Sequence, residues 1–467
     1  MPDVPDAAGP PEIRAAGKRR IWFWAVLIAV GGFLFGFDTG VISGALLFIK
    51  TDFHLSAFEQ GSVVSVLVLG AMVGALAAGR LADRIGRRRL IGLEGVVFLI
   101  GTLIAVLSTE YWMLVAARAV LGLAVGAASA TVPPYLSEIS LKEFRGRVLA
   151  LNQLMITVGI LVAYVINLVF AGSGNWRAMI GAGAVPALLM VVSSLWILPE
   201  SPTWLATRGG RGGTHGRPGG GETVERVVEL REEESREEAP QDRELRTGWR
   251  VLLNEAVRPS LAVGLVLAAA QQFGGINTII YYAPTIIERT GLTASNAIFY
   301  SIAIGVINLA ATVVALRLID RAGRRALLVF SYAAMAVTMA LLGLSIVSDW
   351  HPVVTLVFMV LYIAGYAVGA GPVFWTMIGE VFPPQAGAVG SGASTAVNWV
   401  SNFIVSLAFL SVVHAIGEGQ TFWIFAVVSG LALLFSARFV PETKDRDYSA
   451  IDADLRARFG RPPPAGG

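Results

Sequence analysis

Apolar residues in this chain are gathered into long blocks that alternate with short stretches rich in charge. Apolar blocks of about 18 or more residues predict membrane-spanning helices, because a backbone in lipid must satisfy its own hydrogen bonds. We predict twelve such spans, with ends good to a few residues. They cover residues 21–49, 59–79, 90–108, 111–137, 146–171, 177–198, 257–287, 296–318, 326–348, 353–379, 386–412 and 420–440.

Composition supports an all-α membrane protein and excludes several other classes. The chain has 467 residues, of which 55% are hydrophobic and 15% charged, whereas a soluble domain averages roughly 25% charged residues. The net charge of +3 comes from short loops, so we expect no nucleic-acid partner. The chain has no Cys, and its four His residues lack ligand spacing, so we expect no disulfide, metal or cofactor.

Basic residues predict the orientation. Lys18, Arg19 and Arg20 precede the first span, and further Lys and Arg residues follow spans two, four and eight, which share one side of the membrane. By the positive-inside rule both termini are cytoplasmic. The first apolar block is too long for the core of a signal peptide, which is about 7–15 residues, so we expect it to remain as a span.

The chain repeats itself. Asp83 matches Asp320, Glu138 matches Glu380 and Glu200 matches Glu442, at separations of 237, 242 and 242 residues. Parallel repeats of this kind predict two six-helix halves with the substrate site between them and alternating access by rocking. The predicted divisions are an N-terminal tail (1–20), a first bundle (21–198), a linker (199–256), a second bundle (257–440) and a C-terminal tail (441–467).

The linker and the tail end suggest no further chemistry. Residues 209–221 are rich in Gly and predict a flexible segment, and residues 222–250 are dense in charge and predict a solvated, partly helical one. No Gly-Lys-Ser/Thr closes the Gly run, so it does not resemble a phosphate-binding loop. The Pro-rich stretch 461–464 is expected to be disordered.

Two ionisable residues stand out away from span ends, Asp38 in span one and Arg118 in span four. Each costs at least about 2.5–3.5 kcal/mol at a helix centre. Helical rise places Asp38 roughly 18 Å and Arg118 roughly 10 Å from the outer ends of their spans, so the two could meet. A carboxylate that is protonated as such a pair is disturbed can couple transport to a proton, and we favour this interpretation over a static packing pair.

Span seven is rich in amides. Gln271, Gln272 and Asn277 lie beside two glycines that would let the helix bend, and Tyr281 and Tyr282 follow. Amides in lipid must face protein or water, and one amide can both donate to and accept from a sugar diol. Amides recur in other spans at Gln153, Asn308, Asn398 and Asn402, and aromatic faces that suit the C–H groups of a sugar ring recur at Trp375 and Trp399. As a set they predict a polar, uncharged cavity rather than isolated packing contacts.

Charged residues at the ends of the even-numbered spans predict a network on the cytoplasmic face. Such a network could lock an inner gate, and its repetition in both halves favours this interpretation over topology-setting charge alone. In the first half the predicted members are Asp83, Arg84, Arg87, Glu138, Arg145 and Glu200. In the second half they are Asp320, Arg321, Arg324, Glu380 and Glu442.

Several of these segments resemble a known family. Residues 79–88 are similar to the signature of the major facilitator superfamily. Residues 199–205, 271–277, 371–375 and 441–444 narrow the resemblance to its sugar porter family. The similarity covers about residues 20–445 apart from the Gly-rich insert.

The resemblance implies twelve helices and a hexose, pentose or inositol as the substrate. It also implies that Tyr281 and Tyr282 form the outer gate. Asp38 stands where the family's proton symporters carry Asp and its passive glucose facilitators carry Asn. The implied sugar contacts are Gln153, Gln271, Gln272, Asn277, Asn308, Trp375 and Asn398, with Ile156 and Ile160 lining the cavity.

One departure from the family pattern concerns the second half. Position 387, seven residues after Glu380, is Gly where the family usually has Arg, so we expect a weaker network there that relies on Arg321 or Arg324. The expected function is symport of a monosaccharide with a proton by a monomeric, lipid-embedded protein of the plasma (inner) membrane. Alternatives are a proton/myo-inositol symporter, since residues 40–47 also resemble inositol transporters, a passive facilitator, or a sugar receptor. An enzyme is not expected.

Overall fold

The computed structural model of the chain describes residues 11–140, 145–207, 249–255, 257–383 and 385–460. Twelve helical segments within these residues are long and apolar enough to cross a membrane, which confirms the predicted number of spans. The Gly-rich stretch, most of the charged linker and the Pro-rich end of the tail lie outside the described residues.

The first half contains spans one to six, and the sixth is interrupted after Gly181. Its helices are α1 (Pro11–Asp52), α2 (Ala57–Ile85), α3 (Arg87–Val106), α4 (Tyr111–Ile139), α5 (Arg145–Ala171), α6 (Trp176–Gly181) and α7 (Ala184–Trp196). The short α8 (Pro202–Thr207) follows at the start of the linker.

The second half contains spans seven to twelve, and spans seven and ten are each built from two helices. The helices are α10 (Arg258–Phe273), α11 (Ile276–Arg289), α12 (Ala294–Ala322), α13 (Arg324–Val347), α14 (Pro352–Val368), α15 (Ala370–Glu380), α16 (Gly387–Ile416) and α17 (Glu418–Phe439). A short 3-10 turn η2 (Trp249–Leu253) precedes this half, and α18 (Tyr448–Arg458) follows it within the predicted tail.

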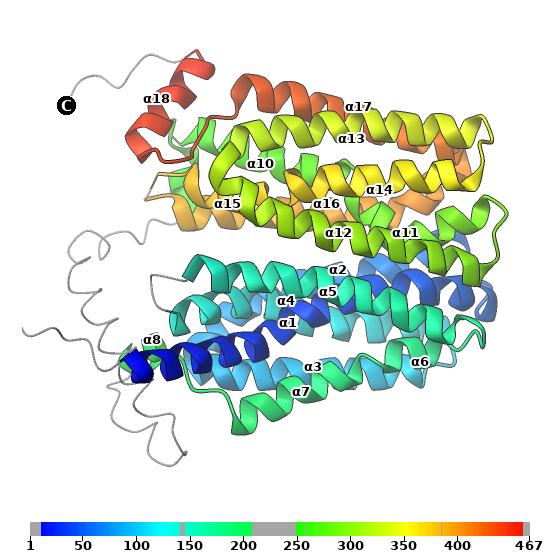
Figure 1. Cartoon of the computed structure of the whole chain (residues 1–467), viewed down its shortest axis with the longest axis horizontal. Coiled ribbons are helices and arrows are strands. Elements are labelled where there is room, and N and C mark those ends of the chain that lie inside the picture. Colours follow the sequence, from blue (N-terminus) through cyan, green and yellow to red (C-terminus); the bar gives the residue numbers. More distant parts are fainter. Residues whose placement is uncertain (1–10, 141–144, 208–248, 256, 384, 461–467) are drawn as a thin grey trace, which may run out of the picture.

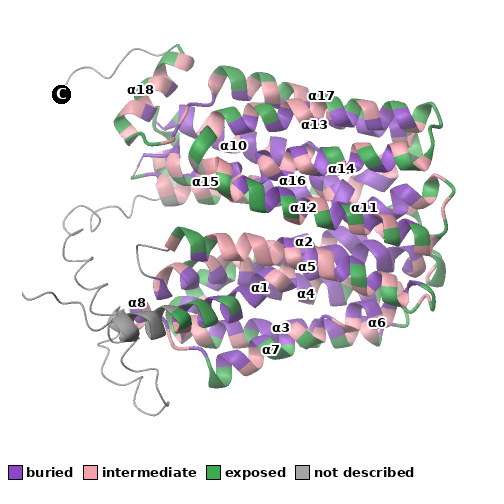
Figure 2. Cartoon of the chain, viewed as in Figure 1, coloured by how far each residue is buried: buried purple, intermediate pink, exposed green. Residues whose placement is uncertain are grey.

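The two halves lie side by side with their helices nearly parallel (Figure 1). Both ends of the described chain, together with α8 and α18, lie at one end of the bundle, which we call the terminal end. Buried residues concentrate between the helices, and exposed residues occupy their outer sides (Figure 2). Large apolar side chains such as Trp112, Val185 and Phe330 are among the exposed ones, as expected where lipid is the solvent.

Close packing of α1 on α5 sets the interior of the first half. A Cβ atom at Gly36 would lie 1.8 Å from the carbonyl oxygen of Ile156. The backbones of α1 and α5 can therefore approach this closely only because Gly36 has no side chain. Small residues permit such contacts between membrane helices, where packing rather than water drives association. Asp38 lies two residues further along α1, so this contact also positions it.

We predict that Gly36→Ala lowers the thermal unfolding midpoint of the purified protein in detergent. Alanine in a helix gains up to about 1 kcal/mol over glycine, but the added methyl meets main-chain atoms that cannot rotate away, and overpacking costs about 1–3 kcal/mol. Gly430→Ala in α17 is the matched control, because a Cβ there meets nothing within 4 Å. Equal midpoints for the two variants would contradict this packing.

Candidate transport site

Asp38 and Arg118 form a buried ion pair between α1 and α4. Arg118 Nη1 lies 2.6 Å from Asp38 Oδ1, and the two residues are 2% and 1% exposed. Arg118 Nε donates to the carbonyl oxygen of Val63 on α2 at 3.0 Å, so one guanidinium joins three helices. Asp38 Oδ2 has no hydrogen-bond partner among the described residues, which leaves one carboxylate oxygen open to a proton.

Tyr281 brings the second half to this pair. Its hydroxyl, on α11, lies within electrostatic reach of Asp38 and Arg118 and within hydrogen-bonding reach of Thr39 and Asn402. Tyr281 is 3% exposed, so it is packed at the contact between α1 and α11. Tyr281 therefore brings a helix of the second half next to the charges of Asp38 and Arg118.

The break in span seven forms at Gly274 and Gly275. Gly275 has a φ of +93°, a left-handed conformation that glycine adopts at little cost, and a Cβ there would lie 2.8 Å from the ring of Phe425. The predicted bend is thus present. It ends α10 directly after Gln271 and Gln272 and starts α11 with Ile276 and Asn277.

Four of the predicted amides form one hydrogen-bonded cluster. Gln272 lies at its centre, because its Nε2 donates to Asn398 Oδ1 at 3.1 Å and its Oε1 accepts from Asn277 Nδ2 at 2.7 Å. Asn398 Nδ2 donates to Gln271 Oε1 at 2.6 Å, and Gln271 Nε2 donates to the carbonyl oxygen of Ala370 at 3.0 Å. Three broken or facing helices, α10–α11, α15 and α16, therefore converge on a neutral polar centre.

The remaining predicted sugar contacts lie on α5, α12 and α15. Asn308 on α12 is 7% exposed, whereas Trp375 on α15 is 45% exposed and makes an edge contact with Phe374. Gln153 and Ile156 on α5 are half-buried, and Ile160 is 4% exposed within the apolar core. The structure thus assembles four amides into a cluster and leaves the other predicted residues outside its hydrogen bonds.

The two tyrosines predicted at the outer gate have different surroundings. Tyr281 faces the Asp38–Arg118 pair, as described above. Tyr282 is fully buried within the second half, where its hydroxyl donates to the carbonyl oxygen of Ser406 at 2.8 Å and its ring lies 5.1 Å from that of Phe409. Tyr282 therefore anchors α11 on α16.

Glu138 and Glu200 organise the charged residues at the terminal end of the first half. Glu138 Oε2 lies 3.2 Å from Arg87 Nε, and Arg87 Nη1 lies 3.2 Å from Asp83 Oδ1. Glu200 Oε1 accepts from the backbone N–H of Arg88 at 3.0 Å, at the start of α3. Arg84 and Arg145 also interact with other residues.

The second half repeats this arrangement with Arg324. Its Nη2 and Nε lie 2.9 and 3.2 Å from the two oxygens of Glu380, and its backbone N–H donates to Glu442 Oε1 at 2.9 Å. We expected Glu380 to rely on Arg321 or Arg324 because position 387 is not an arginine, and it pairs with Arg324 through both carboxylate oxygens. That this network is weaker than the one in the first half stays a prediction. Arg321 offers its carbonyl oxygen to Lys444, and the side chain of Asp320 lies outside the described residues.

Comparisons with known proteins agree with this architecture. Residues 24–455 match the family described as "Sugar (and other) transporter". The chain is 37% identical over 453 residues to the arabinose-proton symporter of Escherichia coli (strain K12), covering 94% of each chain. It is 38% identical over 437 residues to the D-xylose transporter of Levilactobacillus brevis, covering 92% of this chain and 95% of that one.

A solved structure shows the same fold. The xylose transporter of E. coli, in a partially occluded inward-open conformation, aligns with a TM-score of 0.78 and 28% identity, covering 92% of this chain and all of that one. The chain belongs to the sugar porter family of the major facilitator superfamily. It is a multi-pass membrane transporter of sugars and not an enzyme.

Two features of the transporter were missed in the sequence. Lys50 at the end of α1 and Glu288 near the end of α11 form an ion pair 2.5 Å long between the halves, and each lies one residue beyond the end of a predicted span. Glu94 was missed because it lies close to the predicted start of span three, yet it is 3% exposed, so Asp38 and Arg118 are not the only buried ionisable residues. Its position within an otherwise apolar block was the available signal.

We predict that Arg118→Met strongly destabilises the transporter, because removing one member of a buried pair costs about 3–5 kcal/mol. Adding Asp38→Asn should restore part of the loss, since the unpaired carboxylate is then removed. Thermal unfolding in detergent measures both. Acidic buffer should rescue Arg118→Met but not the double variant, because protonation neutralises Asp38. A double variant as unstable as Arg118→Met at every pH would contradict the pairing.

Proposed function

We propose that this sugar transporter carries a monosaccharide together with a proton across the cell membrane, by alternating access. The observation that carries the proposal is the buried Asp38–Arg118 pair, one oxygen of which has no partner among the described residues. An intramembrane ion pair is expensive to keep, so a working role is the default hypothesis for it. Relatives that are named as proton symporters also support coupling to a proton.

Binding of a proton at Asp38 is the proposed coupling step. The proton binds at Oδ2, the carboxyl becomes neutral and its attraction for Arg118 falls, while Arg118 keeps its hydrogen bond to Val63. Tyr281 responds because it lies within reach of both charges. A charge change in the first half thereby shifts the balance between two positions of α11 in the second half.

Helix α11 is the proposed link between proton, sugar and gate. Asn277, Tyr281 and Glu288 are separated by four and seven residues, so they lie along one face of the helix. Asn277 contacts the amide cluster, Tyr281 faces the ion pair and Glu288 binds Lys50. Movement of α11 as a unit would change all three contacts together.

The amide cluster is the proposed sugar-binding centre. Its side chains satisfy one another here, and each can exchange an amide partner for a sugar hydroxyl, which both donates and accepts. A site built for hydroxyls discriminates strongly against analogues that lack them, because its buried polar groups would be left unpaired. Neutral partners suit a neutral monosaccharide rather than a charged solute.

We place the terminal end in the cytoplasm, following the positive-inside rule. The ion pairs of Arg87 and Arg324 each join helices of one half, so in this structure they brace the halves separately. Contacts between the halves include Lys50–Glu288 and the hydrogen bond from Tyr164 to the carbonyl oxygen of Ile280. The end that carries Lys50 is therefore the proposed outer gate, held closed here.

Uptake into proteoliposomes tests the proposal. We predict concentrative uptake of labelled glucose, galactose or xylose that an uncoupler abolishes, and loss of accumulation in Asp38→Asn. Asp349→Asn is the matched control, because that carboxylate lies exposed between α13 and α14. Equilibration by the native protein without response to a proton gradient would indicate a passive facilitator. Accumulation of myo-inositol alone would assign the polyol instead.

Cross-linking tests the proposed outer gate. The chain has no Cys, so Lys50→Cys and Glu288→Cys can be combined without other thiols. We predict that a disulfide or a short thiol cross-linker between them stops net uptake, and that reduction of the disulfide restores it, because the halves can no longer separate at that end. Lys50→Cys alone, treated in the same way, is the control. Normal uptake by the cross-linked protein would disprove this gate.

A further inference from the structure

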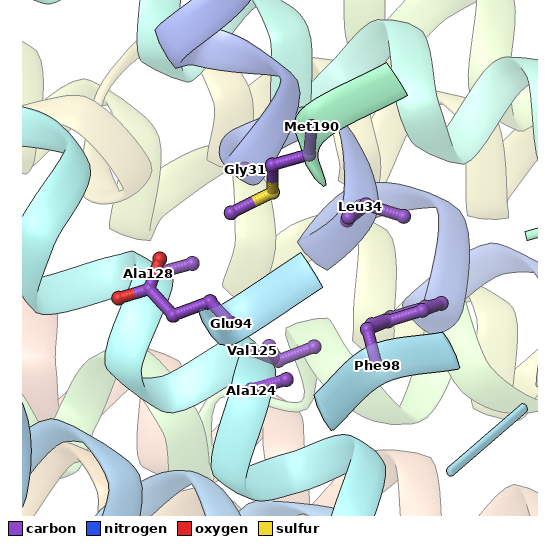
Figure 3. A pocket seen from close by; sticks show the side chains of 8 residues that line it. All are labelled: Gly31, Leu34, Glu94, Phe98, Ala124, Val125, Ala128 and Met190. Carbon is purple, nitrogen blue, oxygen red and sulfur yellow. The ribbon is translucent and has the colours of Figure 1, made fainter. Parts of the chain in front are cut away.

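Glu94 is a buried carboxyl that the proposed transport mechanism does not use. It lies on α3, is 3% exposed, and borders a cavity of about 10 Å³ between α1, α3, α4 and α7. Leu34, Phe98, Val125 and Met190 supply most of the remaining lining (Figure 3). The carboxyl oxygens point toward Ala128 and away from Leu34 and Phe98 (Figure 3). Since a water molecule needs 2–4 polar partners, this lining does not hydrate a carboxylate.

The hydrogen bonds of Thr131 indicate where a proton lies. Thr131 Oγ1 is 2.8 Å from Glu94 Oε1 and 2.9 Å from the carbonyl oxygen of Ala127. A hydroxyl has one hydrogen and can donate it to only one of these acceptors. If Glu94 is the neutral acid, its O–H donates to Thr131 and Thr131 donates to Ala127, so both contacts are satisfied. If Glu94 is ionised, two acceptors compete for one hydrogen.

No countercharge compensates an ionised Glu94 within the described residues. Its other oxygen, Oε2, has no hydrogen-bond partner there. The neighbouring helix α7 contains no ionisable residue, and the charged groups on the other helices packed against α3 have partners elsewhere or lie at helix ends. The paired groups are Arg118 with Asp38, Glu138 with Arg87, Arg177 with Asp52, and Lys50 with Glu288. The groups near helix ends are Arg19, Arg20, Glu59, Arg80, Asp83 and Arg84.

We propose that Glu94 is a second proton-binding site, separate from Asp38, at which the folded transporter holds a neutral carboxylic acid that donates to Thr131. The two sites lie at different depths, because Thr131 and Arg118 are thirteen residues apart on α4, roughly 20 Å along the helix. Burial of an unpaired charge is far more costly than burial of a hydrogen-bonded acid. The bound proton thus joins α3 to α4.

Protonation of Glu94 makes the stability of the folded protein depend on pH, and the direction of the change can be stated. The folded protein favours protonated Glu94, whereas an unfolded chain exposes the carboxyl to water. Stability contributed by this group is therefore complete in acidic buffer and is lost as the pH rises through the range in which the buried acid ionises. The proposal does not rest on proton-coupled transport, since it concerns a group away from Asp38.

Infrared spectroscopy of the purified, membrane-reconstituted protein tests the proposal. We expect a carboxylic-acid C=O band at neutral pH that is absent in Glu94→Gln and retained in Asp38→Asn. Glu94→Gln should also lose less stability than the native protein as the pH is raised, because its amide cannot ionise. A Glu94→Gln spectrum identical to that of the native protein in this region would overturn the proposal.

A second variant keeps the test decisive if Glu94→Gln fails to fold. Thr131→Val keeps the shape of the side chain and removes the hydroxyl that bonds Glu94. We expect the acid C=O band to move to higher wavenumber, because the carboxylic acid loses its hydrogen-bond acceptor. A band of unchanged position would contradict the assignment. Thr338→Val on α13 is the matched control, because that hydroxyl donates to a backbone carbonyl of its own helix and not to a carboxyl.

Discussion

A buried charge in a membrane protein needs a partner, and in this transporter the partner of Asp38 is Arg118. The guanidinium also holds the carbonyl oxygen of Val63, so α1, α2 and α4 meet at one side chain. The packing of α1 on α5 at Gly36 then positions Asp38, and Tyr281 approaches the pair from the second half. The arrangement of the interface between the halves depends on satisfying these two charges.

The same requirement explains the repeated pattern at the terminal end. Glu138 lies near the end of span four and Glu380 ends span ten, and each pairs with an arginine at the start of another helix of the same half. Ser201 and Thr443 donate a hydroxyl hydrogen bond to these glutamates at 2.5 Å. The two halves therefore repeat the contacts of these glutamates, and not only their charges.

Much of this architecture could be predicted from the sequence, because a chain in lipid must satisfy its own backbone hydrogen bonds and therefore crosses the membrane as long apolar helices. The twelve spans, the repeat and the meeting of Asp38 with Arg118 follow from apolar block length, spacing and helical rise. The break at Gly275 was also visible as paired glycines among amides. By contrast, the cluster of Gln271, Gln272, Asn277 and Asn398 depends on helices distant in sequence, and periodicity cannot say which amides meet.

The features that the sequence concealed are contacts between distant segments. Lys50 and Glu288 are 238 residues apart, so each looks like a solvated charge until the halves are placed together. Arg324 was an expected partner of Glu380, but spacing along the chain could not show that its guanidinium binds both carboxylate oxygens. Glu94 differs, because its burial follows from the packing of α3 against α4 and α7, which a single span does not reveal.

Direct observation of proton movement tests coupling through the Asp38–Arg118 pair most sharply. Protein is reconstituted without any imposed gradient, sugar is added outside, and a pH-sensitive dye follows the external solution. We expect a sugar-dependent alkalinisation for the native protein and none for Asp38→Asn, although the variant still exchanges labelled sugar. Sugar entry without any pH change in the native protein, or an undiminished pH change in Asp38→Asn, would contradict coupling through the Asp38–Arg118 pair.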